Sequence, residues 1–162
     1  MIACSRFEMQ IQEQHILVNN QTYLLSTDKG KLDIDAIADY LIHQSYWATT
    51  RTFEQVRNSI EHSLCFAVYY ENNQIAFGRV ISDYTTFAYL ADVFVLENHR
   101  KQGISKALMH FILMHPNLQN LRRFMLATKD SHGLYSQFGF KALYWPERWM
   151  EVYSPTKDDS NR

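Results

Sequence analysis

The chain has 162 residues, of which 46% are hydrophobic and 14% aromatic, and this suits one compact domain with a sizeable core. Sixteen Lys and Arg against seventeen Asp and Glu give a formal net charge of -1. No overall positive field therefore exists to attract nucleic acid or an anionic membrane. Cys4 and Cys65 lack the spacing of a CxxC or Cys/His metal site, so we expect no bound metal and no disulfide framework.

The N-terminal residues 1–20 carry charges such as Arg6 and Glu13 where a signal peptide needs an apolar stretch. The longest apolar stretches, residues 87–95 and 107–114, are far shorter than a membrane span. We therefore expect a cytoplasmic protein without a membrane partner.

The first third of the chain predicts a hairpin followed by two helices. Rough apolar alternation over residues 9–18, the turn signal Asn19-Asn20 and a strand-like run over residues 22–26 predict the hairpin. Apolar residues at helical spacing predict a helix over residues 34–42, and Val56 and Ile60 belong to a second one over residues 52–62.

From Leu64 onward the apolar pattern changes to that of strands. Three runs rich in Val, Ile, Phe and Tyr, separated by turn residues, predict an antiparallel meander. The predicted strands are residues 65–70, 74–82 and 87–95. The remaining predicted elements are a helix over 101–115, a strand over 123–128, a short helix over 133–138 and a last strand over 142–152. We expect one domain over residues 1–153 and a polar tail over residues 154–162.

One strand-turn-helix unit carries the spacing R-x-x-G-x-S at Arg100, Gly103 and Ser105. The first N–H groups of a helix have no intrahelical partner and favour an anion, so such a turn can hold a pyrophosphate. Glycine allows close backbone approach, serine adds a hydroxyl donor, and Arg100 and Lys101 add positive charge. A packing accident would leave the same local pattern. The unit is neither a Walker A sequence nor a dinucleotide fingerprint, which argues against ATP and NAD.

Two motifs resemble those of the GNAT family of N-acetyltransferases. Residues 93–108, VFVLENHRKQGISKAL, resemble its acetyl-CoA motif V-x-x-x-x-[RQ]-x-x-G-x-[GA], with Ser105 in place of Gly or Ala. Residues 134–140, LYSQFGF, resemble its second signature [FL]-Y-x-x-x-G-F. The resemblance covers about residues 66–152. It implies the α/β GNAT fold, with a central, mostly antiparallel mixed sheet of six to seven strands flanked by about four helices.

The resemblance also implies acetyl-CoA as co-substrate and roles for particular residues. The backbone amides of Phe94 and Val95 would hold the pantetheine and polarise the acetyl carbonyl. Tyr135 would protonate the departing thiolate; the alternative is that this tyrosine, one of ten in the chain, packs in the core. Thr128 and Ser131 stand where the family often has Asn and Ala, which puts the pantetheine contacts on that side in question. The expected cofactor-binding residues are Val93, Phe94, Val95, Arg100, Lys101, Gln102, Gly103, Ile104, Ser105 and Lys106.

The general base is a separate question, for which Asp92 is the first candidate. A carboxylate inside so apolar a strand costs several kcal/mol unless it is paired or solvated in a cleft. Strand alternation places it with Phe94 on the face opposite Val93. Asp92 is therefore a candidate base or amine anchor, and equally a residue that holds a neighbouring loop by hydrogen bonds. Asp83 and His132 are the alternative bases.

Aromatic residues mark two places where an acceptor can lie. Tyr46 and Trp47 fall between the two early helices, and Trp145 belongs to an aromatic cluster over residues 144–149. Each cluster can line an acceptor site or pack as core, and the second can also form a dimer contact. Asp83 would favour a cationic amine, and arginines such as Arg51 would favour a carboxylate.

These residues together predict an acetyl-CoA-dependent N-acetyltransferase that transfers the acetyl group to the primary amine of a small molecule, which is amino-acid-like if both charges are used. The amine attacks the thioester directly. An enzyme for protein N-termini or lysines is one alternative, and a non-catalytic acyl-CoA sensor is another. The sequence is compatible with a monomer or a homodimer.

Overall fold

The computed structural model describes residues 10–154 as a six-stranded sheet with helices on both faces. The strands lie in sequence order, each neighbouring pair antiparallel except β5 and β6, which are parallel. The mixed, mostly antiparallel sheet confirms the predicted fold class. The strands are β1 (Glu13–Val18), β2 (Gln21–Ser26), β3 (Leu64–Tyr70), β4 (Asn73–Ser82), β5 (Phe87–Val95) and β6 (Arg123–Leu126).

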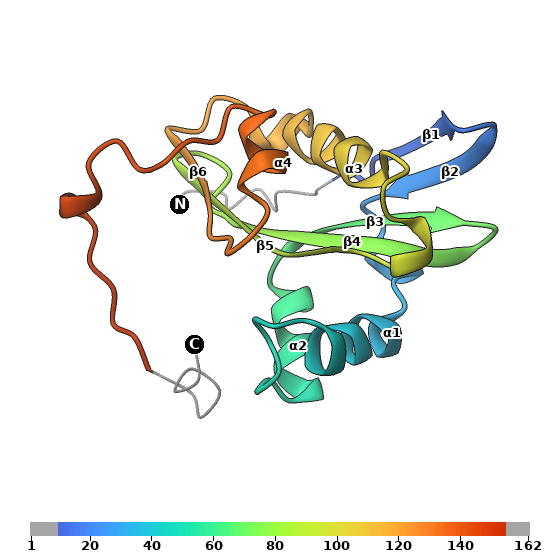
Figure 1. Ribbon diagram of the computed structural model, residues 1–162, viewed down its shortest axis with the longest axis horizontal. Helices are drawn as coiled ribbons and strands as arrows, with labels where there is room; N and C mark the ends of the chain where they lie inside the picture. Colours follow the sequence, from blue (N-terminus) through green and yellow to red (C-terminus); the bar gives the residue numbers. More distant parts are fainter. Residues whose placement is uncertain (1–9, 155–162) are drawn as a thin grey trace, which may run out of the picture.

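Four α-helices cover the sheet from its two sides (Figure 1). The helices are α1 (Ile34–Asp39), α2 (Phe53–Glu61), α3 (Ile104–Leu113) and α4 (His132–Ser136). Helices α1 and α2 pack on one face around Ile37 and Phe77, and α3 packs on the other around Phe66 and Leu108. The site described below lies between these layers.

The sequence explains why α1 and α2 begin where they do. Thr52 caps α2 by accepting a hydrogen bond from the Gln55 N–H at 3.2 Å, and the Gln55 side chain accepts from the Thr52 N–H at 2.9 Å. This reciprocal capping box satisfies two amides that the helix cannot satisfy itself. Asp33 caps α1 more simply, because its carboxylate accepts one hydrogen bond from the Ala36 N–H at 2.9 Å. Helix α1 then changes to a π-helical turn over Tyr40–Gln44 instead of continuing as α-helix to residue 42.

Strand β5 contains a bulge at the position of the buried carboxylate. Its register with β4 shifts between Phe77 and Arg79, so that Asp92 and Val93 both oppose Gly78. Asp92 has a φ of 54°, in the left-handed region. The extra residue turns the Asp92 side chain to the face covered by α1 and α2, while Val93 stays on the α3 face. The predicted face of Asp92 is therefore confirmed.

The predicted last strand over residues 142–152 is wrong. Residues 142–154 contain a 3-10 turn, Pro146–Arg148, and no strand, and Figure 1 shows them running away from the sheet. The strand-like composition is present, but a strand needs a neighbouring strand, and no strand within residues 10–154 pairs with residues 142–152. Of the predicted polar tail, all but residue 154 lies outside the described residues, as does Cys4. None of the helices within residues 10–154 has the length and apolarity of a membrane span.

Candidate functional site

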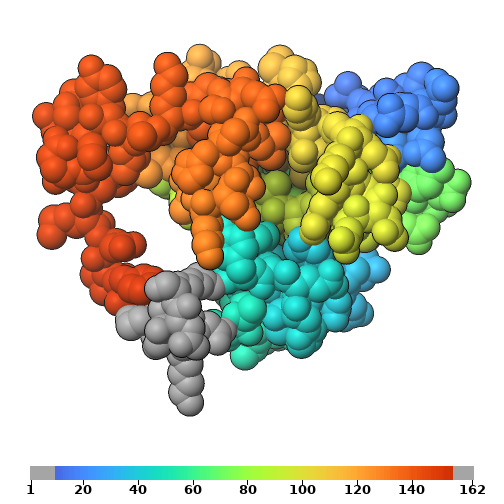
Figure 2. Space-filling view, viewed as in Figure 1, coloured from blue at the N-terminus to red at the C-terminus, as the bar shows by residue number. Residues whose placement is uncertain are grey.

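A cavity of about 430 Å³ opens beside the C-terminal half of β5. Its walls come from the loop after α1, the end of β5, the loop before α3 and helix α4 (Figure 2). These segments are far apart in the sequence and meet only in the folded chain. The predicted site residues that line this cavity are Tyr46, Trp47, Val93, Phe94, Val95, Arg100, Lys101, Ser105 and Tyr135.

The loop before α3 has the backbone shape of an anion site. Gly103 precedes the helix with a φ of 88°, and Lys101 also has a positive φ, of 58°. Ala107 donates its N–H to the Gly103 carbonyl at 3.0 Å, and the amides before it precede the first helical hydrogen bond. A Cβ on Gly103 would meet no heavy atom within 4 Å. The open space in front of these amides fits a pyrophosphate.

Side chains hold this loop from two sides. Arg100 donates from Nε to the Val95 carbonyl at 2.9 Å and from Nη2 to the Tyr40 hydroxyl at 3.0 Å. The Tyr23 hydroxyl donates to Gln102 Oε1 at 3.3 Å. The Arg100 guanidinium therefore ties the loop to the end of β5, in addition to bringing positive charge to the cavity wall.

Four of the expected cofactor-binding residues do not line the cavity with their side chains. These are Gln102, Gly103, Ile104 and Lys106. Ile104 is 1% exposed and belongs to the core under α3. Because its side chain is buried, Ile104 can meet a ligand only through its backbone.

Strands β5 and β6 separate beside the cavity. Their parallel pairing ends at Leu90 and Leu126, whereas β5 continues to Val95 with β4 as its neighbour. Backbone groups of residues 91–95 on the side of β6 are left without a strand partner within the described chain. An extended ligand can pair with them as an added strand would.

Tyr135 on α4 reaches the cavity as a half-buried side chain. Burial, with smaller contributions from Tyr46 and Asp130, raises the pKa of Tyr135 to about 12. Its ring meets Phe140 edge to face at 6.0 Å between centroids, which fixes its orientation. The phenol is therefore protonated at neutral pH and can act as a hydrogen donor.

Asp92 lies behind the cavity wall in a buried ion cluster. Its carboxylate accepts from Arg79 Nε at 2.6 Å, from Arg51 Nη1 at 2.7 Å and from Trp47 Nε1 at 3.1 Å. Burial alone would raise the pKa of Asp92, but the charges and hydrogen bonds of the two arginines outweigh it and lower the pKa. With three donors and a side chain 1% exposed, the carboxylate is a poor proton acceptor. The geometry supports the alternative in which Asp92 holds a neighbouring loop, and it engages Arg51 there.

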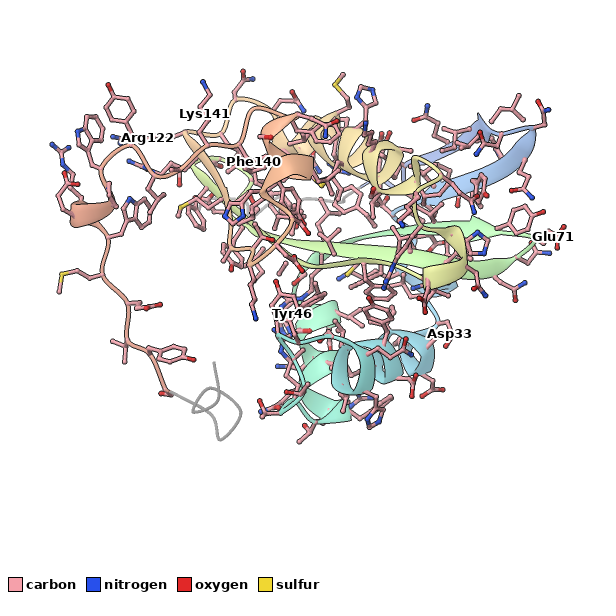
Figure 3. The ribbon with its side chains drawn as sticks, viewed as in Figure 1. Asp33, Tyr46, Glu71, Arg122, Phe140 and Lys141 are labelled. Atoms are coloured by element: carbon pink, nitrogen blue, oxygen red, sulfur yellow. The ribbon has the colours of Figure 1, made fainter. Side chains whose placement is uncertain are left out.

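Tyr46 and Trp47 form the wall of the cavity that faces α4. Their rings meet edge to face at 5.0 Å between centroids, and Tyr46 extends toward the opposite layer (Figure 3). The Lys129 N–H donates to the Tyr46 hydroxyl at 3.1 Å, and the Lys129 ammonium lies 5.8 Å from the same ring. This contact bridges the two sides of the cavity.

Two predicted acceptor contacts, Asp83 and Trp145, do not reach the cavity. Asp83 is exposed, and its carboxylate accepts from the backbone N–H groups of the turn that follows it, at residues 85–87. The hydrogen bond from the Thr86 hydroxyl, together with these backbone hydrogen bonds, lowers the pKa of Asp83. Trp145 is 41% exposed in the segment that leaves the body, with the Arg148 guanidinium 4.2 Å from its ring. Asp83 and Trp145 therefore contact residues close to them in the sequence and do not border the cavity.

Asp130, which no sequence motif marked, lines the cavity next to Ser131. Among residues 10–154 it is the one carboxylate in the cavity wall. The signal was its place just after β6, because loops at the C-terminal ends of parallel strands commonly carry functional side chains. His132 instead lines a second cavity behind α4. No group of three or more His, Cys, Asp or Glu side chains within residues 10–154 can hold a metal ion.

Comparisons with known proteins agree with this geometry. Residues 34–140 match the model of the acetyltransferase (GNAT) family. A crystal structure of a GNAT-family protein from Xanthomonas campestris pv. campestris is 50% identical, with a TM-score of 0.80, and the match covers 82% of this chain and 94% of that one.

More distant relatives extend the comparison. FG08082 of Gibberella zeae, a protein named as an acetyltransferase, is 28% identical over 71% of this chain and 76% of its own length. The ribosomal-protein-S18-alanine N-acetyltransferase of Escherichia coli shares the fold, with a TM-score of 0.60 at 17% identity over 74% of this chain and 77% of that one. The family match and the 50% identical structure decide the assignment. This chain belongs to the GNAT family of acetyltransferases.

Proposed function

We propose that this protein is an acetyl-CoA-dependent N-acetyltransferase whose acceptor is the primary amine of a small molecule, with an amino-acid-like compound as the working case. One observation carries the proposal. The loop before α3, the end of β5 that has no β6 partner, a protonated phenol and an aromatic wall all border one cavity. Transfer of an acetyl group from a thioester to an amine requires these four parts.

Acetyl-CoA would lie along the loop and the strand. Amides at residues 101–106 would bind its pyrophosphate, with Lys101 and Ser105 beside them. Amides at residues 93–95 would pair with its pantetheine in the gap between β5 and β6. Bound in this way, acetyl-CoA supplies an acetyl group activated as a thioester.

The residues at the end of β5 and on α4 would then serve the two ends of the reacting bond. A backbone N–H near Phe94 stabilises the negative charge that develops on the carbonyl oxygen. A carbon–nitrogen bond forms to the amine, the carbon–sulfur bond breaks, and Tyr135 donates its proton to the sulfur. Water returns to Tyr135 the proton that a neutral amine loses in the attack, and an acceptor that arrives as an ammonium group first releases one further proton to water.

Asp130 replaces Asp92 in our proposal for the amine anchor. It lines the cavity, and it lies close enough to Tyr135 for its charge to raise the pKa of that phenol. A carboxylate there attracts an ammonium group and can accept its proton through a water molecule. Asp92 instead accepts a hydrogen bond from Trp47 and so positions that side chain in the cavity wall.

The bridge between Tyr46 and Lys129 favours a small acceptor over a protein. It spans the two layers that border the cavity, so a folded protein surface has less access than a free amine. The likeness to the S18-alanine enzyme is one of fold alone and does not change this preference.

Release of free CoA from acetyl-CoA over a panel of amines tests the proposal. We expect Tyr135→Phe to lower kcat by about 10²–10⁴-fold, the usual contribution of a general acid, without weakening acetyl-CoA binding. Tyr144→Phe is the matched control, because Tyr144 is 81% exposed and lies outside the cavity. If acetyl-CoA binds but no amine accelerates CoA release, the enzyme proposal fails and the acyl-CoA sensor replaces it.

A further inference from the structure

Exposed apolar side chains concentrate in the segment that leaves the body, residues 142–153. Met150 is 97% exposed and Val152 101% exposed, and they lie among other exposed apolar residues instead of standing singly. Figure 2 shows this segment standing off the rest of the molecule. Large contiguous apolar exposure of this kind marks an interaction surface. The other exposed apolar residues of the segment are Leu143, Tyr144, Trp145, Trp149 and Tyr153.

A second feature, the outer edge of β6, lacks a partner of its own. Within residues 10–154, β6 pairs with β5 alone. Beside this edge lies a cavity of about 570 Å³ between β6 and α4, with Phe124, Leu126, Phe140 and Leu143 in its wall. Figure 3 shows Phe140 in this region. An edge strand with exposed N–H and C=O groups next to an apolar groove is a template for another strand.

The path of the chain shows why the segment does not fill the groove of its own body. The Arg123 guanidinium lies 4.8 Å from the Trp149 ring, so the segment passes the first residue of β6 as it leaves. Residues 150–153 continue beyond that point, away from the sheet (Figure 1). Pairing with their own β6 would require the chain to reverse after Trp149.

We propose that two copies of this chain exchange residues 149–153. The segment of each copy adds as a strand to the outer edge of β6 of the other, and Met150 and Val152 enter the groove between β6 and α4. The exchange is reciprocal, so one two-fold axis satisfies both edges and both segments. The exposed side chains of Met150 and Val152 and the free outer edge of β6 within residues 10–154 are therefore complementary.

The exchanged strand also bears on the cavity at the front of α4. Tyr135 borders both the groove and the front cavity. A partner strand in the groove would brace α4 from behind and restrict the movement of this phenol. This consequence rests on the proposed function, whereas the exchange itself does not.

The double substitution Met150→Glu with Val152→Lys tests the exchange. Both side chains are fully exposed in a single copy, so their replacement leaves an isolated fold intact, as circular dichroism can check. We expect the wild-type protein to show the mass of two copies by light scattering and the variant the mass of one. The β6 amides that do not face β5 should exchange hydrogen slowly in the wild type and rapidly in the variant.

Leu17→Lys with Met114→Glu is the matched control, because these apolar residues are 70% and 62% exposed on other faces. The control should keep the mass of two copies. A wild-type protein with the mass of one copy overturns the proposal, and slow exchange at β6 in that case shows that the segment folds back on its own chain. A dimer that survives the double substitution also overturns it, because another face must then hold the copies together.

Discussion

The proposed cofactor side and the proposed acceptor side of the cavity are built in different ways. The cofactor side is one continuous stretch, residues 93–106, whose shape depends on a helix start and two positive φ angles. The acceptor side joins three separated segments around Tyr46, Asp92 and Asp130, held by a buried ion cluster and one bridging hydrogen bond. Substitutions on the cofactor side should weaken ligand binding. Substitutions on the acceptor side should lower activity by destabilising the fold or by displacing the side chains of the site.

Asp92→Asn should give the largest effect on stability. It leaves Arg79 buried without its anion, and breaking a buried ion pair costs about 3–5 kcal/mol in unfolding free energy; the 30% exposure of the Arg51 side chain favours the lower end. Thermal or urea unfolding measures it. Arg79→Met added to Asp92→Asn should recover part of the loss because it removes the stranded charge. Normal stability with lost activity would instead make Asp92 the general base.

The contribution of Asp92 should also depend on pH. Its pKa is lowered in the folded protein, so the stability it adds is fully present above its unfolded pKa of about 3.9. That stability is lost as the pH falls through the folded pKa. The difference in unfolding free energy between wild type and Asp92→Asn should therefore be constant from about pH 5 to 7 and shrink below about pH 4. A difference that does not change in acid would contradict the ion cluster.

Gly103→Val should show whether the loop before α3 binds acetyl-CoA, provided that the effect on binding is distinguished from the effect of backbone strain. A side chain there occupies the phosphate space, and the loss of one or two charge-assisted hydrogen bonds weakens acetyl-CoA binding about 100-fold. Gly139→Val is the matched control, because Gly139 has a φ of 86°, close to the 88° of Gly103, and follows α4 instead of belonging to the loop before α3. Both variants should lose about 1–2 kcal/mol of stability, but calorimetry should show weak binding for Gly103→Val alone. Equal affinity in the two would remove the phosphate assignment.

Asp130→Asn should give the smallest effect, a rise of about tenfold in KM for the amine, which corresponds to one exposed charge-assisted contact of about 1.4 kcal/mol. The KM for acetyl-CoA should not change. Glu71→Gln, which removes a carboxylate at the far end of the sheet (Figure 3), should leave both constants as they are. Unchanged amine KM in Asp130→Asn would place the amine anchor elsewhere.

The order of strands and helices was predictable because each element carries its own periodicity and caps, as Thr52 and Gln55 do for α2. The strand-turn-helix unit around Gly103 was predictable for the same reason, since its residues are neighbours in the chain, and its role in binding an anion stays a prediction. The roles of Asp92 and Asp130 were not predictable. Whether a carboxylate is paired or faces a cavity depends on contacts with residues tens of positions away, such as Arg51, and on the bulge that turns Asp92.

Family membership and the strand-turn-helix unit around Gly103 could be predicted from local patterns, because helix starts, glycine positions and apolar periods are properties of neighbouring residues. Which side chains meet in the cavity depended on the tertiary structure. It likewise decided that residues 142–153 stay off their own sheet, since a strand forms only where an edge is within reach. The composition of residues 142–153 allows a strand, but whether one forms depends on where a neighbouring strand lies.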